Sequence, residues 1–145
     1  MKKIIGVVGG TLLLLLSYNN VFAGGPWNAS SAQFGASQVA CLMDTAANSS
    51  TIDNMNFQSR TALSFLTQIV IFELEASKQS VVNPVLMAKV KYLQGIANMM
   101  YVSINTVLNA PNQQKLYRAK MAAKYAHILN DALSKLVPSP STGCG

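Results

Sequence analysis

The sequence predicts an all-α protein, a small antiparallel bundle of about four helices that is closed by one disulfide. Two observations lead to this fold class. Apolar residues recur at three- and four-residue steps over four long stretches, which is the pattern of amphipathic helices. No segment between the Pro-, Asn- and Ser-rich breaks alternates strictly between apolar and polar residues, so no sheet is expected.

The first two helices carry many small and apolar residues. One is expected from about residue 30 to 48, where the segment NSSTIDN ends it with cap and turn residues. The second is expected from about residue 54 to 78. Its IVIF segment alone would suit a strand, but the helix-forming sequence on both sides favours a helix. The residues expected on its buried face are Ala62, Phe65, Leu66, Ile69, Phe72 and Ala76. This face is broadened by Leu63, Val70, Ile71 and Leu74, so the second helix is expected to be the most buried.

The third helix is expected to begin at Pro84, with Asn83 as its cap, and to end near Leu108. Its apolar residues form a heptad-like seam, the packing geometry of antiparallel bundles. The seam consists of Leu86, Val90, Leu93, Ala97, Met100, Ile104 and Val107. Gly95 interrupts this helix, either to allow a close helix contact or without a structural role.

The fourth helix is expected to open at Pro111 and to end near Leu136, before Pro138 and Pro140. Its seam consists of Ala119, Ala122, Ala126, Leu129, Leu133 and Leu136. The short connections between the helices favour antiparallel neighbours.

The first 23 residues have the layout of a secretory signal peptide. Lys2 and Lys3 give it a positive start, residues 4–16 are apolar, and small residues precede a cut expected after Ala23. The apolar segment is too short to span a bilayer. We therefore expect an exported protein, periplasmic or secreted, of a Gram-negative bacterium. It would have one helical domain over 24–137 and a tail over 138–145.

Export would bring the two cysteines, Cys41 and Cys144, into an oxidising compartment. An intramolecular disulfide between them is the favoured interpretation, and the tail would then fold back along the first helix. Free thiols or an intermolecular bond through Cys144 are the alternatives. In the chain-entropy model, a loop of about 100 residues stabilises the fold by about 4.7 kcal/mol.

Positive charge is concentrated in the second half of the chain. Residues 24–75 hold four acids and one base, whereas residues 76–145 hold eight bases and one acid. Helices three and four are therefore expected to present a basic face. The residues assigned to this face are Lys89, Lys91, Lys115, Arg118, Lys120 and Lys124.

Basic residues are most closely spaced near the start of the fourth helix. Lys115 and Arg118 fall near a helix N-terminus, where the helix dipole already disfavours cations. Free backbone N–H groups together with these cations would suit an anion. The expected partner is an anionic membrane surface or another phosphate-bearing ligand, and the alternative is a solvated helix face. Nucleic acid is less favoured, because aromatic residues do not interleave with the bases.

The sequence offers little for catalysis, metals or cofactors. His127 is the only histidine, and Asp131 lies one turn later and could pair with it, but no nucleophile motif accompanies them. Glu73 and Glu75 are two residues apart and point to different sides of a helix. Met43 and His127 are residue types that bind haem in exported four-helix cytochromes, but C-x-x-C-H is missing, and core packing explains Met43 better. We expect no enzyme, no metal and no cofactor.

A signal peptide, a small basic bundle and one disulfide together resemble the small exported substrates of type II secretion in intracellular bacterial pathogens. That resemblance implies a non-enzymatic effector that acts by binding. A periplasmic accessory component of a secretion or conjugation machine, which binds a protein partner through an apolar groove, has the same features and is the alternative. The sequence does not indicate the oligomeric state.

Overall fold

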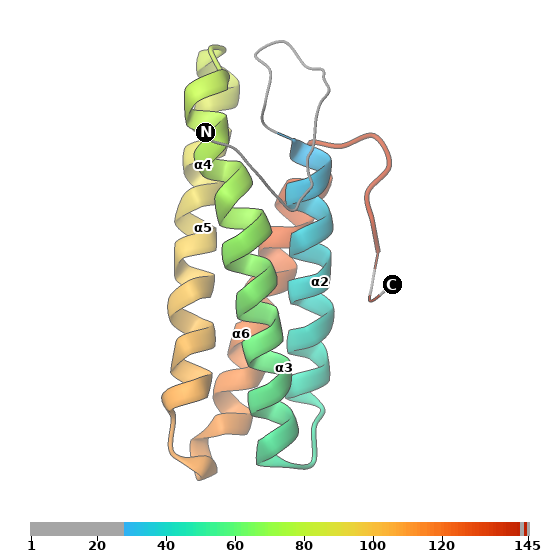
Figure 1. Ribbon diagram of the computed structural model, residues 1–145, viewed down its shortest axis with the longest axis vertical. Coiled ribbons are helices and arrows are strands. Elements are labelled where there is room, and N and C mark those ends of the chain that lie inside the picture. Colours follow the sequence, from blue (N-terminus) through green and yellow to red (C-terminus); the bar gives the residue numbers. More distant parts are fainter. Residues whose placement is uncertain (1–27, 143, 145) are drawn as a thin grey trace.

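The computed structural model describes residues 28–142 and Cys144, and the expected signal peptide lies outside these residues. The described chain forms four helical rods and no strand (Figure 1). The first rod is α2 (Ala29–Ala47), and the second joins α3 (Ile52–Phe65), η1 (Leu66–Ile71) and α4 (Phe72–Ser80) without a break. The third and fourth are α5 (Pro84–Asn109) and α6 (Asn112–Ser134). The predicted all-α antiparallel bundle is confirmed.

The helices begin where polar side chains can cap them. The Asn28 side chain accepts a hydrogen bond from the backbone N–H of Ser31, and Thr51 accepts one from Asn54. Asn83 caps α5 with Pro84 in the first turn, as the sequence predicts. Pro111 sits one residue before α6, so this helix begins one residue later than expected.

The four rods form a square in which α2 and α5 lie on one diagonal. Helix α2 packs against α6 and α3, and α5 packs against the same two neighbours. The predicted seams of α5 and α6 form a large part of the core. The fully enclosed seam residues are Val90, Leu93, Ala97, Met100, Ile104, Val107, Ala119, Ala122, Ala126, Leu129 and Leu133. Leu86 and Leu136, at the outer ends of the two seams, are only partly buried.

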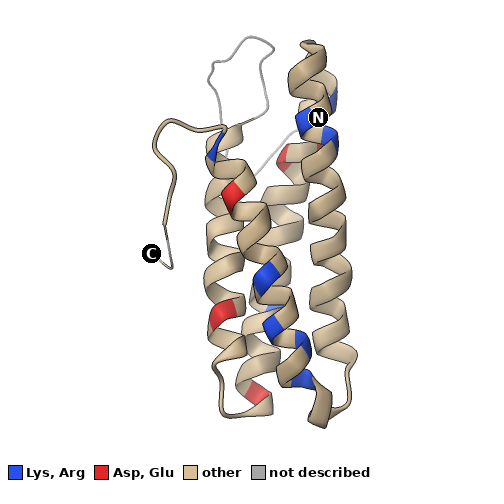
Figure 2. Cartoon of the chain, turned by 180° about the vertical axis from the view of Figure 1, so that it is seen from behind, with Lys and Arg blue, Asp and Glu red and all other residues tan. Residues whose placement is uncertain are grey.

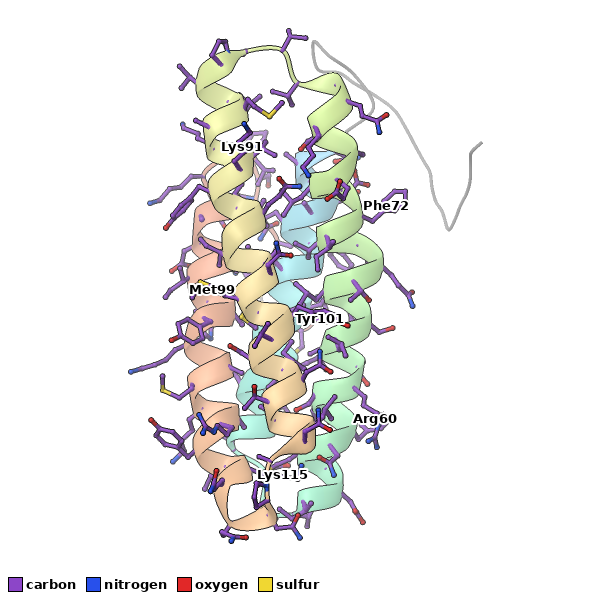
Figure 3. All side chains as sticks on the ribbon, turned by 90° about the vertical axis from the view of Figure 1, so that its left-hand side faces the viewer. Arg60, Phe72, Lys91, Met99, Tyr101 and Lys115 are labelled. Atoms are coloured by element: carbon purple, nitrogen blue, oxygen red, sulfur yellow. A yellow bond between two sulfur atoms is a disulfide. The ribbon has the colours of Figure 1, made fainter. Side chains whose placement is uncertain are left out.

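The predicted apolar face of the second rod is correct at Leu66, Val70 and Leu74 but wrong at Phe72, because η1 is a π-helix. Its i→i+5 turns are wider than α-helical turns and rotate every residue that follows. The buried positions therefore continue at four-residue steps through Leu66, Val70 and Leu74. Phe72, expected in the core, is 61% exposed and points away from the bundle (Figure 3).

A glycine of α2 lies against this π-helix. A Cβ added to Gly35 would come within 2.9 Å of the Cγ2 atoms of both Ile69 and Val70. Real Cβ contacts are longer, so α2 and η1 can approach this closely only because position 35 has no side chain. Gly95, in contrast, has no atom within 4 Å of its added Cβ, so it serves no close contact inside the described bundle.

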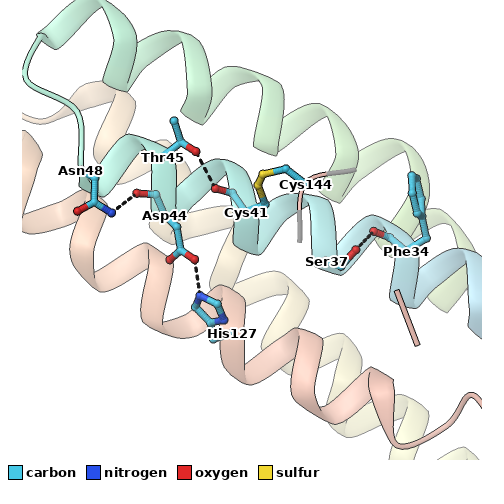
Figure 4. Close-up of a disulfide and its surroundings, with 8 residues drawn as sticks. All are labelled: Phe34, Ser37, Cys41, Asp44, Thr45, Asn48, His127 and Cys144. Carbon is cyan, nitrogen blue, oxygen red and sulfur yellow. Dashed lines mark hydrogen bonds and ion pairs between the residues drawn. A yellow bond between two sulfur atoms is a disulfide. The ribbon is translucent and has the colours of Figure 1, made fainter. Parts of the chain in front are cut away.

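The C-terminal tail returns along α2, as expected. Cys41 and Cys144 are joined in a disulfide with their Cα atoms 5.4 Å apart (Figure 4). After α6 the chain turns at Leu136 and Val137, and the buried Val137 covers the end of the core. The tail then runs in the same direction as α2, past Gln33 first and Cys41 second.

Candidate functional site

The outer face of α6 carries three exposed cations in its N-terminal half. All three side chains, Arg118, Lys120 and Lys124, are exposed. Lys120 and Lys124 lie one turn apart on the same side of the helix, whereas Arg118, two residues before Lys120, points to a different side, towards α5. Among the described residues the ion pairs are Lys78 with Glu75 and His127 with Asp44. These three cations therefore have no acidic partner in the described part of the chain. We call them the α6 basic stripe.

Two further side chains extend the chemistry of the α6 basic stripe. Tyr117, which precedes it, is exposed, and the Arg118 guanidinium carbon lies 5.7 Å from its ring centroid. Ile128, one turn after Lys124, is also exposed. A cationic stripe with an aromatic and an aliphatic side chain beside it is amphipathic, and such side chains suit the boundary between water and lipid headgroups.

Lys115 does not belong to this surface, contrary to the expectation. It is 4% exposed, and its Nζ donates hydrogen bonds to the backbone oxygens of Val107 at 2.7 Å and Leu108 at 2.8 Å. Both carbonyls lie in the last turn of α5, where the helix leaves acceptors without intrahelical partners and its dipole is negative. The ammonium therefore caps α5 at the turn into α6 (Figure 3). The position near the N-terminus of α6 concealed this role in the sequence.

Lys89 and Lys91 are exposed but lie at the opposite end of the bundle from the α6 basic stripe. Both fall in the early turns of α5, whereas the stripe begins near the turn that follows the end of α5. Figure 2 accordingly shows blue segments at two separate levels of the molecule. The single basic face expected on helices three and four is therefore divided into two groups.

His127 pairs with a residue of another helix and not with Asp131. Its Nε2 lies 2.7 Å from the Asp44 Oδ2 of α2, and both side chains are about half exposed (Figure 4). A solvent-exposed pair of this kind adds little to stability. Met43, the other residue considered as a haem ligand, is fully buried in the core. The described residues contain no group of three acidic, histidine or cysteine side chains that could hold a metal ion.

Glu73 lies in a buried environment that the sequence pattern did not reveal. Burial raises the pKa of its carboxyl group from the usual 4.5 to about 7, and a hydrogen bond from the backbone N–H of Asn28, 3.0 Å from Oε1, opposes that rise. Glu75 is exposed and pairs with Lys78 at 3.3 Å. The two glutamates lie in different environments, as their spacing predicts. Glu73 joins α4 to the start of α2.

Gln33 is the second residue that the sequence did not reveal. Its side chain is buried, and its amide pairs with the backbone of Ser141. Oε1 accepts from the Ser141 N–H at 2.7 Å, and Nε2 donates to the Ser141 oxygen at 2.8 Å and to Asn130 Oδ1 at 2.9 Å. Gln33 thus satisfies both backbone hydrogen-bonding groups of Ser141, as a neighbouring β-strand would. With the disulfide, it fixes the tail at two points along α2.

No protein-family model, curated protein or solved structure matches this chain significantly. Within the described residues, no helix is both long enough and apolar enough to cross a bilayer. Function must therefore be argued from the surfaces described above.

Proposed function

We propose that this chain is an exported, non-enzymatic protein that binds anionic membrane surfaces through the α6 basic stripe. The observation that carries the proposal is the exposure of Arg118, Lys120 and Lys124 without an acidic partner among the described residues. Unpaired cations on a rigid helix keep their full attraction for an external anion, because no internal ion pair must first be broken. Tyr117 and Ile128 add contacts suited to the headgroup region.

The expected strength follows from the number of cations. Each lysine or arginine near an anionic membrane contributes about 1 kcal/mol, so Lys120 and Lys124 together contribute about 2 kcal/mol and raise the affinity about 30-fold. The attraction decays over a Debye length of about 10 Å at 0.1 M salt. Binding should therefore be clear in dilute buffer and weak at high ionic strength.

Vesicle pelleting tests the proposal. Vesicles of phosphatidylcholine alone are compared with vesicles that contain about 30% phosphatidylglycerol, at about 0.05 and 0.3 M salt. We expect the chain to pellet with the anionic vesicles at low salt only. Competition by free inorganic phosphate distinguishes a phosphate site from a lipid surface, because a charged surface gains its affinity from many headgroups together.

A matched pair of variants locates the surface. Lys120→Glu with Lys124→Glu should abolish pelleting, whereas Lys89→Glu with Lys91→Glu makes the same change in net charge at the other end of the bundle and should retain most of it. Pelleting that survives the α6 reversal, or that does not depend on salt, would contradict the proposal. Equal loss in both variants would mean that only net charge matters.

Export is tested separately from lipid binding. The chain should accumulate outside the cytoplasm and begin at Gly24 in a mass spectrum of the intact protein. Its mass should be that of the oxidised chain, two hydrogens lighter than the chain with two free thiols. A cytoplasmic chain that retains residues 1–23 would contradict export and leave the vesicle experiment to be judged by itself.

A further inference from the structure

The outward face of α5 carries a second apolar stripe in addition to its core seam. It consists of Val85, Ala88, Tyr92, Gly95, Met99 and Val102, which recur at alternating steps of three and four residues. Its four large side chains, Val85, Tyr92, Met99 and Val102, are 69%, 62%, 52% and 63% exposed. A continuous heptad of exposed apolar residues has the spacing of a coiled-coil seam and is uncommon on a solvated helix face. We call it the α5 outer stripe.

We propose that the α5 outer stripe pairs with the same stripe of a second copy of this chain, antiparallel, in a two-fold symmetric dimer. In an antiparallel coiled coil the two seam positions of the heptad face each other across the interface. Aligning Val85 with Val102 of the second copy then brings Tyr92 opposite Gly95 and Met99 opposite Ala88. All six positions find a partner, and the two largest side chains meet the two smallest.

Gly95 gives an independent reason for this register. Glycine weakens the interior of a helix, and Gly95 lies near the middle of α5, a helix of 26 residues. Its added Cβ would have no atom of this chain within 4 Å, so packing inside the described bundle does not require a glycine there. The ring of Tyr92 of a second copy would occupy that open space.

The surface around Ala88 is hollowed. Pro84, Val85, Ala88, Lys89 and Tyr92 line a shallow, largely apolar depression of about 530 Å³. In the antiparallel register this depression receives Met99 of the second copy, whose flexible side chain adapts to irregular space. Met99 is itself half exposed and is labelled on α5 in Figure 3.

Side-chain size favours the antiparallel orientation over the parallel one. Lys89 and Lys91 flank the N-terminal half of the stripe, and Arg118 of α6 lies beside Val102 at its other end. Parallel pairing would place the lysines of both copies at one level and would set Tyr92 against Tyr92 and Gly95 against Gly95. Antiparallel pairing avoids both of these like contacts, because it sets Tyr92 opposite Gly95.

The buried area predicts a weak dimer. The exposed parts of the stripe amount to roughly 500 Å² in each copy, or about 1,000 Å² in total, which is at the lower limit of specific interfaces. Interfaces of this size associate in the micromolar range when the packing is good. Dimerisation should therefore depend on protein concentration.

Sedimentation equilibrium of the full chain with the Cys41–Cys144 disulfide formed, from micromolar to millimolar concentration, tests the proposal. We expect a reversible monomer–dimer equilibrium. Gly95→Leu should raise the dissociation constant at least tenfold because it fills the space for Tyr92, while circular dichroism shows an intact fold. Ser64→Leu, which adds the same side chain to an exposed position of α3, should leave the dissociation constant unchanged.

Cysteine cross-linking tests the orientation. A mixture of Val85→Cys and Val102→Cys chains should form mixed disulfide dimers, and Val85→Cys alone should not. Cross-linking of Val85→Cys with itself would contradict the antiparallel register. A chain that stays monomeric at every concentration, or a Gly95→Leu variant that dimerises like the wild type, would overturn self-pairing. The vesicle experiment is judged separately on Lys120→Glu with Lys124→Glu, because these two lysines lie on α6 and do not belong to the α5 outer stripe.

Discussion

Replacing Gly35 by alanine should destabilise the bundle although it improves the intrinsic helix propensity of α2. The new Cβ would lie 2.9 Å from two methyl groups, and 3.1 Å from the Cβ of Ile69, an atom attached directly to the backbone of the π-helix. Relief therefore requires a shift of η1 or α2 as a whole. Overpacking of this kind costs about 1–3 kcal/mol, and we expect the upper end because a backbone must move.

The helix-propensity term opposes this cost and can be measured separately at Gly95. Alanine is favoured over glycine in a helix interior by about 1 kcal/mol. Gly95→Ala meets no atom within 4 Å, so it should stabilise the monomer by about that amount. Gly35→Ala should then destabilise by about 2 kcal/mol, which is the overpacking cost of about 3 minus the propensity gain of about 1.

The assay is urea unfolding followed by circular dichroism, at a few micromolar protein so that self-association does not contribute. The two alanine variants should differ by about 3 kcal/mol in the free energy of unfolding. A difference below about 1 kcal/mol would refute the reasoning, because it would mean that η1 yields to a methyl group at little cost.

Three further perturbations test individual residues. Glu73→Gln should remove a pH dependence of the free energy of unfolding. Because the folded pKa of about 7 exceeds the usual 4.5, the wild type should lose on the order of 3 kcal/mol of stability as pH rises from about 4.5 to above 7. Urea unfolding of the glutamine variant should show no such loss. Lys115→Met should lower the free energy of unfolding by about 2 kcal/mol because two α5 carbonyls lose a charged donor. Its pelleting with anionic vesicles should not change, and Lys120→Met should cost less than about 0.5 kcal/mol. Gln33→Leu should abolish hydrogen-exchange protection of the Ser141 amide, because Gln33 Oε1 accepts the hydrogen bond from that N–H in the folded chain. Retained protection would show that the disulfide alone holds the tail.

The sequence determined the elements of this protein because their signals are local. Asn83 and Pro84 mark the start of α5 through a cap and a fixed backbone angle, and the heptad steps of α5 and α6 identify the residues that form the core. The pairing of Cys41 with Cys144 could also be predicted from the sequence, because the chain has only two cysteines and the tail is long enough to reach back to the first helix.

Only the tertiary structure decided the properties that depend on neighbouring helices. The π-helix turned Phe72 outward, and it is accommodated by a glycine on α2 that no periodicity connects with it. Lys115 was expected at the surface, but its ammonium lies on the carbonyl end of the preceding helix. His127 and Gln33 likewise found partners about 80 to 110 residues away. Sequence periodicity gives the direction of a side chain around its own helix. The atoms that it meets there depend on how the helices pack.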